Sequence, residues 1–443
     1  MALETARVLS ILSPLILAAC GGISGSASNG TLPLGRFSDV SAHSAARYAE
    51  EVLYNFRGSN GENPNGGVTL DKTGSLYGTS GGGAYNSGAV FKLTPSGSAY
   101  TESLLYSFTG GADGSGPLGG VVLDKKGAIY GTTLRGGGND SAGTVFKLTP
   151  SGSGYTESVL HSFCAESGCA DGENPMAGLI LDNKGALFGT TEAGGPNNDC
   201  LTAVIGCGTV FKLTPSGASY IETVLYAFCT ATCDSGAFPS AGLVFGKDGA
   251  LYGTTPIDVD QCLDFHLYDY CGTVFKLTRS GSRYTETTIY TFCAKASCED
   301  GADPSAALIF DKQGALWGTT FYGGTSNLGT VFKLTPSGSG YTESVLHSFT
   351  GGSDGAYPYA GLTLAQDGAL YGTTQSGGVG HRGTVFKLAP AGSGYTESIV
   401  FHFHGTDGAY PDGGVTIGKQ SALYGTTDLG GRHGKGTVFE AFR

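Results

Sequence analysis

The chain has 443 residues, of which 77 are glycine and only 14% are charged, and tyrosine and phenylalanine number 23 each. Aromatic and β-branched residues favour strands and abundant glycine suits frequent turns, so the composition predicts an all-β protein. The formal net charge of −12 would repel phosphate groups. Because no basic run offsets that charge, the sequence argues against nucleic acid as a partner.

The N-terminal residues 1–20 have the features of a signal peptide with a lipobox. An apolar run at residues 8–19 is too short to cross a bilayer as a helix and ends at Cys20. Residues 17–21 (Leu-Ala-Ala-Cys-Gly) resemble a bacterial lipobox, whose cysteine is acylated and becomes the new N-terminus. A plain secretory signal with an incidental cysteine is the alternative. We expect an exported lipoprotein, held in the outer membrane or at the cell surface by its lipid anchor.

Residues 21–46 are small and polar and show no apolar period, which predicts a flexible tether of about 30 Å. The next segment, residues 48–56, matches the pattern of residues 155–163. It therefore predicts one strand of a repeat that stands alone, ahead of the first complete repeat.

The remaining chain, within residues 47–443, is organised by a two-part repeat. Residues 127–133 (Gly-Ala-Ile-Tyr-Gly-Thr-Thr) typify the first half and residues 143–152 (Gly-Thr-Val-Phe-Lys-Leu-Thr-Pro-Ser-Gly) the second. Seven copies occur, and their spacing of 53 to 65 residues, filled by short strands and turns, is typical of a propeller blade. The aromatic residue of the first half falls at Tyr77, Tyr130, Phe188, Tyr252, Trp317, Tyr371 and Tyr424.

Each repeat predicts four strands, a to d. In the second repeat these are residues 119–124, 128–133, 143–149 and 154–163, with turns at 124–127 and 149–152. The seventh repeat stops after strand c, and residues 47–56 supply its missing strand d. The sequence thus predicts a monomeric seven-bladed β-propeller, closed by the N-terminal strand completing the last blade, with one core per blade.

The repeat string resembles that of the bacterial choice-of-anchor tandem repeat proteins called GloVer-containing. The resemblance recurs in every repeat and covers nearly everything after residue 47. It implies an exported, surface-associated protein whose anchor varies between members. It implies no activity, no cofactor and no catalytic residue.

Strand direction assigns the loops to two faces of the disc. The a to b and c to d turns lie on one face, and the b to c loops and the d to a crossovers lie on the other, which we call the variable face. Ten cysteines fall in its loops as five local pairs, and an even count in an exported chain predicts disulfides rather than zinc ligands. The pairs are Cys164 with Cys169, Cys200 with Cys207, Cys229 with Cys233, Cys262 with Cys271, and Cys293 with Cys298.

Other polar groups have simpler interpretations. The Asp-Gly pairs that precede each crossover proline suit turns without any metal, and His161 and His347 replace tyrosines at one repeat position. His381, His404 and His433 fall on adjacent loops of the variable face, so they are weak candidates for a metal site or for acid and base chemistry.

Three functions remain open: a binding module for glycan or protein, a propeller lyase or hydrolase using those histidines, and a structural cell-surface protein. The b to c loop of blade 4 favours binding, because it replaces the usual glycines by aromatic residues set among aspartates. Its own folding as a cover over the blade is the alternative. The predicted ligand-binding residues are Asp258, Asp260, Asp264, Phe265, His266, Tyr268, Asp269 and Tyr270.

Overall fold

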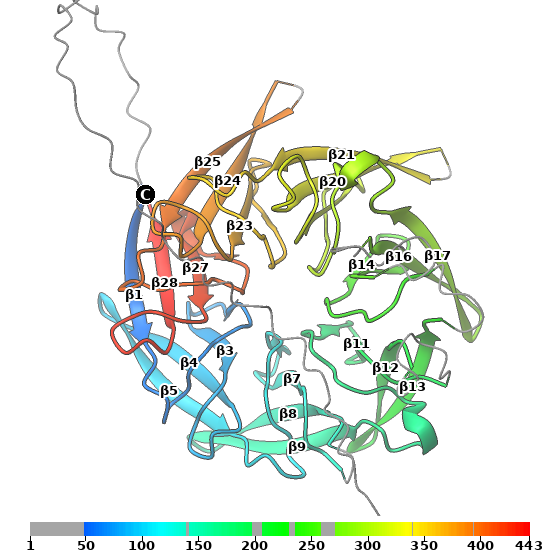
Figure 1. Ribbon diagram of the computed structural model, residues 1–443. Helices are drawn as coiled ribbons and strands as arrows, with labels where there is room; N and C mark the ends of the chain where they lie inside the picture. Colours follow the sequence, from blue (N-terminus) through cyan, green and yellow to red (C-terminus); the bar gives the residue numbers. More distant parts are fainter. Residues whose placement is uncertain are drawn as a thin grey trace, which may run out of the picture. The chain divides into compact units, whose positions relative to one another are not determined.

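The computed structural model describes residues 48–138, 141–196, 206–229, 235–257, 271–338, 340–392 and 394–443. These residues form 28 β-strands and three short 3-10 helices. The strands make seven antiparallel sheets of four, arranged as blades around one axis (Figure 1). The predicted seven-bladed β-propeller is therefore confirmed. The lipobox cysteine Cys20 and the tether lie outside the described residues.

The first six blades follow the chain in order, and strand a is innermost in each. Blades 1 to 3 comprise β2 (Thr69–Leu70), β3 (Leu76–Ser80), β4 (Ala89–Ser96) and β5 (Ala99–Ser107); β6 (Val122–Leu123), β7 (Ile129–Thr133), β8 (Thr144–Ser151) and β9 (Gly154–Ser162); and β10 (Ile180–Leu181), β11 (Leu187–Thr191), β12 (Thr209–Ser216) and β13 (Ser219–Ala227). Blades 4 to 6 comprise β14 (Val244–Phe245), β15 (Leu251–Thr255), β16 (Thr273–Ser280) and β17 (Arg283–Thr291); β18 (Ile309–Phe310), β19 (Leu316–Thr320), β20 (Thr330–Ser337) and β21 (Gly340–Ser348); and β22 (Thr363–Leu364), β23 (Leu370–Thr374), β24 (Thr384–Ala391) and β25 (Gly394–His402). The 3-10 helices are η1 (Ser167–Cys169), η2 (Ala296–Cys298) and η3 (Lys419–Ser421).

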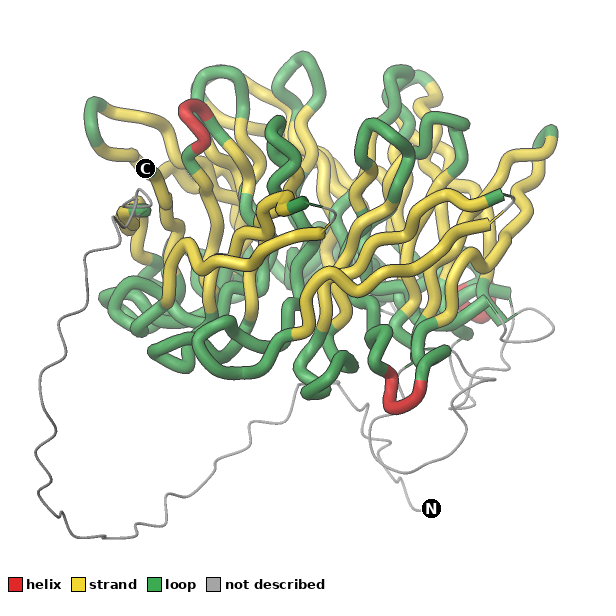
Figure 2. The backbone as a smooth tube through the Cα atoms, turned by 90° about the horizontal axis from the view of Figure 1, so that it is seen from above, coloured by secondary structure: helices red, strands yellow, loops and turns green. Residues whose placement is uncertain are grey.

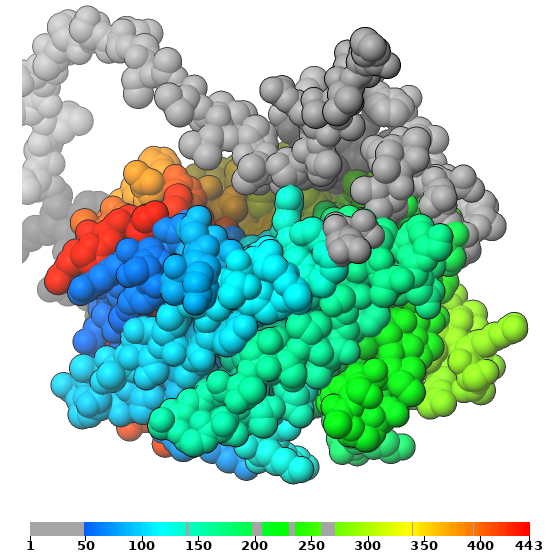
Figure 3. Space-filling model, turned by 90° about the horizontal axis from the view of Figure 1, so that it is seen from below, coloured from blue at the N-terminus to red at the C-terminus, as the bar shows by residue number. Residues whose placement is uncertain are grey.

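Blade 7 joins the two ends of the described chain. It is built from β26 (Thr416–Ile417), β27 (Leu423–Thr427) and β28 (Thr437–Phe442), and its outer strand is β1 (Ala49–Asn55). Strand β1 pairs antiparallel with β28 from Ala49 opposite Phe442 to Asn55 opposite Thr437. The first strand, in dark blue, and the last, in red, lie side by side in Figures 1 and 3. The ring closes as the sequence predicts.

The repeat motif serves the packing of strand b against strand c and against the next blade. Gly131 must lack a side chain, because a Cβ there would lie 2.6 Å from Cζ of Phe146. The Oγ1 of Thr133 lies 2.8 Å from that of Thr144, which ties strand b to strand c. The contact between glycine and phenylalanine recurs in all seven blades, and the threonine pair recurs in blades 2 to 7, whereas blade 1 has Ser80 opposite Ala89. The motif is therefore structural.

The first threonine of each Gly-Thr-Thr or Gly-Thr-Ser triplet joins neighbouring blades near the axis. Its Oγ1 donates to a backbone carbonyl oxygen just before strand a of the next blade, over 2.8 to 3.1 Å. Seven such bonds complete a circle: Thr79 to Gly119, Thr132 to Ala177, Thr190 to Ala241, Thr254 to Ala306, Thr319 to Ala360, Thr373 to Gly413 and Thr426 to Gly66. Because these donors and acceptors are buried, each bond is costly to lose.

The hydrophobic cores lie between blades rather than within them, which corrects the expectation of one core per blade. One cluster, for example, unites Tyr130 and Val145 of blade 2 with Leu187 and Phe211 of blade 3. Strand d contributes through a β-bulge, since Val145 pairs with His161 and Phe146 with Val159, which leaves Leu160 to pack against the cluster. A two-residue strand a cannot cover a blade alone, so neighbouring blades bury each other's faces.

The turn between strands c and d differs from the prediction at residues 149–152. Strand β8 continues through Pro150 to Ser151, and a two-residue turn begins at Gly152, whose φ is 60°. Glycine with positive φ at the first turn position fits a type II′ hairpin. Proline is tolerated in the strand because Pro150 pairs only with Tyr155, and β7 does not extend far enough to need its N–H.

Candidate functional site

Crossovers and b to c loops meet on the variable face, as strand direction predicts. A backbone bridge joins the two loop types in every blade, for example Ser115 with Arg135 in blade 2 and Ala302 with Tyr322 in blade 5. Figure 2 shows the strands from the side, with loops at both ends. The variable face is therefore a layer of paired loops rather than separate projections.

One position of each crossover comes close to the axis. This position is the residue after the crossover proline, and it immediately precedes a pair of small residues that touch the neighbouring blades. A Cβ added to Gly178 would lie 2.9 Å from the carbonyl oxygen of Gly120. A Cβ added to Gly414 would lie 2.9 Å from the carbonyl oxygen of Gly361. These contacts surround the axis, so the seven preceding side chains surround it too. They are Asn65, Leu118, Met176, Ser240, Ser305, Tyr359 and Asp412.

Aromatic side chains form a wall between blades 5 and 6 at this level. Phe321 stacks on Tyr357 with ring centroids 5.0 Å apart and packs edge-on against Tyr359 at 5.8 Å. Tyr322 contacts Phe321 and Tyr357 at 4.8 and 5.7 Å. Tyr359 keeps 38% of its surface exposed. The wall therefore presents an accessible ring on a packed support.

Carboxylates lie around this wall. Burial raises the pKa of Asp303 and of Asp412 to about 7. Burial and then the charges of Asp412, Asp303 and Glu192 raise the pKa of Tyr359 to about 12. Glu192 belongs to blade 3 and Asp412 to blade 7, so charges from distant parts of the ring act on Tyr359.

We call this group the axial cluster. Gln375 anchors it by donating to Asp412 Oδ1 over 2.9 Å, and burial raises the pKa of Asp428 beside it. Perturbed carboxylates next to exposed aromatic rings are a typical sign of a functional site. The cluster consists of Glu192, Asp303, Phe321, Tyr322, Tyr357, Tyr359, Gln375, Asp412 and Asp428.

The sequence reasoning did not single out these residues. For Tyr359 and Asp412 a signal was nevertheless present, because the position after the crossover proline differs in nearly every repeat while its neighbours stay small or apolar. The predicted ligand-binding residues of blade 4, from Asp258 to Tyr270, lie outside the described residues, so that prediction stays a prediction.

The structure joins Cys164 to Cys169 and Cys293 to Cys298 by disulfides. Cys207, Cys229 and Cys271 are also disulfide-bonded, and their predicted partners Cys200, Cys233 and Cys262 lie outside the described residues. Each of the two complete bridges closes a short turn next to a crossover, beside η1 and η2.

The three candidate histidines do not form a metal site. Within the described ranges no group of three or more His, Cys, Asp or Glu side chains is placed to hold a metal ion. His381 and His433 are exposed, and His404 pairs with Asp407, its Nδ1 lying 3.3 Å from Oδ2.

His161 and His347 pack as the sequence indicates, and they have a second role. Each ring lies edge-on against a buried phenylalanine, Phe163 or Phe349. His161 Nε2 also lies 3.1 Å from Asp171 Oδ2, and this carboxylate accepts a bond from the Ala165 backbone N–H. The crossover aspartates therefore fix the end of strand d, as turn residues do.

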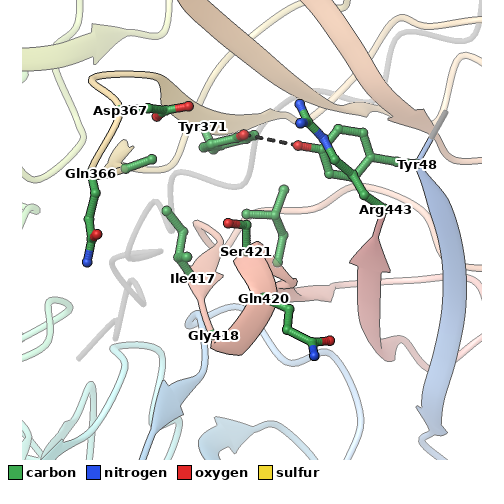
Figure 4. Close-up of a pocket in the computed structure, with 11 residues that line it drawn as sticks. Tyr48, Gln366, Asp367, Tyr371, Ile417, Gly418, Gln420, Ser421 and Arg443 are labelled. Carbon is green, nitrogen blue, oxygen red and sulfur yellow. Dashed lines mark hydrogen bonds between the residues drawn. The ribbon is translucent and has the colours of Figure 1, made fainter. Parts of the chain in front are cut away.

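A separate cavity of ≈ 400 Å³ lies at the closure, between the a to b turns of blades 6 and 7 (Figure 4). The Tyr48 and Tyr371 hydroxyls are 3.0 Å apart at its edge, and the guanidinium of Arg443 lies 5.0 Å from the centre of the Tyr48 ring. Three of its polar side chains thus already contact one another where the two ends of the described chain meet, and we regard the cavity as part of the closure.

The fold and the axial cluster define a β-propeller whose loops carry a candidate binding surface on one face. The chain belongs to the Gloeobacter/Verrucomicrobia repeat family, whose model matches residues 23–262 and 265–442. The resemblance inferred from the repeat is confirmed.

Solved structures similar to this chain share little sequence with it. They include a protein assigned as an oxidoreductase (glucose dehydrogenase) from Thermus thermophilus, with 16% identity and TM-score 0.42, and with 73% of this chain and 95% of that one covered. A protein assigned as a 6-phosphogluconolactonase from Bacteroides uniformis has 13% identity, TM-score 0.47 and coverage of 76% and 84%. A gluconolactonase from Xanthomonas campestris has 16% identity, TM-score 0.40 and coverage of 74% and 88%. Likeness at this level says nothing about activity.

No curated protein matches the sequence closely enough to be called a relative. Among the described residues, no helix has the length and apolar character needed to cross a bilayer.

Proposed function

We propose that the protein is an exported binding module, anchored in the outer membrane or at the cell surface through Cys20, that takes a glycan or protein ligand on its variable face. The lipobox pattern and the family of the repeat support export and a membrane or cell-surface location. The axial cluster supports the binding role, because it combines an accessible aromatic ring with hydrogen-bonding carboxylates at the point where all seven blades converge.

The single observation that carries this proposal is the position of Tyr359. Its ring packs edge-on against Phe321, and the charges of Asp412 and Asp303 add to the effect of burial in raising the pKa of its hydroxyl. A ring supported on one side and open on the other can stack on a sugar ring or an apolar side chain. The blades hold these groups in place before binding, which lowers the entropy cost of association.

A binding screen with residues 47–443, using glycans and surface proteins with and without a chelator, tests this function. Tyr359→Ala should weaken any ligand found by at least about tenfold, as removal of a central aromatic anchor does. Tyr85→Ala is the matched control, since Tyr85 is 62% exposed in a b to c loop outside the axial cluster. Equal loss in both variants, or no loss in either, would place the ligand elsewhere.

The anchor is tested by fractionation. Cys20→Ser should move the protein from the membrane fraction to the soluble periplasmic or culture fraction, because the acylated thiol is removed. Retention in the membrane fraction would show that the anchor is not this cysteine.

A further inference from the structure

We infer that the axial cluster binds an organic cation, an ammonium or guanidinium group carried by the ligand, between Asp303 and Asp412 and against the aromatic wall of Phe321, Tyr357 and Tyr359. This inference rests on the proposed binding function and gives the chemical class of the ligand.

The first step is the lack of a positive partner for these two carboxylates. Asp303 accepts a hydrogen bond from the Ser305 hydroxyl, and Asp412 accepts one from the Gln375 amide. Each bond uses Oδ1, and no bond reaches either Oδ2 within the described part of the chain. The ion pairs found there all involve other residues.

The second step is energetic. A carboxylate enclosed by protein is disfavoured in its charged form unless a positive charge lies near it. Burial raises the pKa of both Asp303 and Asp412 to about 7, and the neighbouring charge of Asp428 adds to the effect on Asp412. A ligand cation would reduce this penalty, so its binding is favoured by the same burial that raises the two pKa values.

The third step is the aromatic wall. Cations are attracted to the faces of tyrosine and phenylalanine rings within about 6 Å, most strongly where water is excluded. This chain already uses that interaction: Lys333 Nζ lies 4.4 Å from the Trp317 ring centre, and Arg382 lies 5.7 Å from that of Tyr410 beside the axial cluster. Tyr359 offers a ring of the same kind that no described Lys or Arg covers.

An inorganic cation fits less well, because the described residues hold no set of three or more ligand side chains around one point. An organic cation needs only one or two carboxylates and an apolar surface for its carbon atoms. Amino sugars and the lysine or arginine side chains of a protein share this chemistry.

Isothermal titration with four probes shows whether binding depends on the charge or on the shape of the ligand, and whether a sugar or a peptide binds more strongly. Tetralysine and a glucosamine tetramer carry ammonium groups. Tetralysine amide acetylated at its α-amino and all ε-amino groups and an N-acetylglucosamine tetramer are their counterparts without a cation. We expect at least one cationic probe to bind and its neutral counterpart to bind about tenfold or more weakly. The stronger of the two cationic probes identifies the source of the ammonium group.

Two variants test the carboxylates. Asp412→Asn and Asp303→Asn should each weaken the cationic probe by about tenfold. Glu299→Gln is the matched control, because Glu299 is an exposed acid on the same crossover as Asp303. Thermal melting of each variant shows whether it is folded, and a folded Asn variant that binds with unchanged affinity overturns the inference.

Binding of tetralysine should also strengthen between pH 5.5 and 8, since lysine stays charged while Asp303 and Asp412 lose their protons. The other titratable groups facing the site are Glu192, Asp428 and Tyr359. Equal binding of neutral and cationic probes, lost in Tyr359→Ala, would overturn the cation inference and leave the binding function standing. A ligand from the broader screen that binds independently of Tyr359 would instead place binding outside the axial cluster and contradict the site on which the proposed function rests.

Discussion

Thr426 in the last blade donates a hydrogen bond from its Oγ1 to the carbonyl oxygen of Gly66 in the first blade, over 3.0 Å. The two residues are 360 positions apart, and the other six blade junctions have the same bond between residues 40 to 52 positions apart. The junction between the last and the first blade therefore has the same hydrogen bond as the other six, although the chain does not run directly from one of these two blades to the other.

Thr426→Val should destabilise the protein by about 1 to 3 kcal/mol, because the methyl group keeps the shape but leaves the buried Gly66 carbonyl without its donor. Thermal or denaturant unfolding measures the loss. Thr101→Val is the control, since Thr101 is exposed on an outer strand and the same replacement should change stability by less than about 0.5 kcal/mol. Equal effects in the two variants would show that the bond has no net value.

A chain beginning at residue 57 should lose the closed ring. Without β1, strand β28 presents an unpaired edge, and the buried Phe56 is missing from the cluster it shares with Phe91 and Tyr424. We expect a lower melting temperature and self-association, seen by light scattering. A chain beginning at residue 47 keeps β1 and is the control. A monomeric truncated protein with unchanged melting temperature would contradict closure by β1.

Gly131→Ala should destabilise the protein by about 1 to 3 kcal/mol, because the added Cβ would lie 2.6 Å from the Phe146 ring. The ring is fully buried and has little room to shift. Gly154→Ala is the matched control on the outer strand of the same blade, where nothing lies within 4 Å of a new Cβ. The difference between the two melting temperatures measures the packing effect alone.

Stability should fall as the pH rises from about 5 to 8. One glutamate of strand d in every blade is partly buried, and burial raises its pKa, to about 7 for four of the seven and to about 8 for Glu222. Since the unfolded value is about 4.3, the folded protein holds more protons than the unfolded chain within this window, and unfolding becomes easier as the protons leave. The seven residues are Glu50, Glu102, Glu157, Glu222, Glu286, Glu343 and Glu397.

Melting temperatures across that pH range measure the effect. Glu222→Gln, which mimics the protonated state, should reduce the dependence on pH. Aspartates with a lowered pKa, such as Asp71 and Asp113, act in the opposite direction only below about pH 4. A melting temperature that is constant or rises between pH 5 and 8 would show that these glutamates are ionised in the folded state.

The sequence by itself determined the blades, their number and the closure, because the signals involved are local and recur seven times. The triplet that runs from Gly131 to Thr133 in blade 2 marks strand b in every repeat. The Asp-to-Gly turn after strand a follows from side-chain hydrogen bonds, such as the one that the Lys126 N–H donates to Asp124 Oδ1. The local pattern failed at Pro150, whose turn preference was overridden by pairing with Tyr155 at the end of β8 that β7 does not reach.

Only the tertiary structure decided where the candidate site lies. Asp303, Tyr359 and Asp412 are more than 50 residues apart in succession and resemble ordinary loop residues in the sequence. They meet because ring closure brings the same crossover region of successive blades to one axis. Burial raises the pKa values of all three, with added effects of the Asp428 charge on Asp412 and of the Asp412, Asp303 and Glu192 charges on Tyr359. These effects depend on how the ring packs and not on a local sequence pattern.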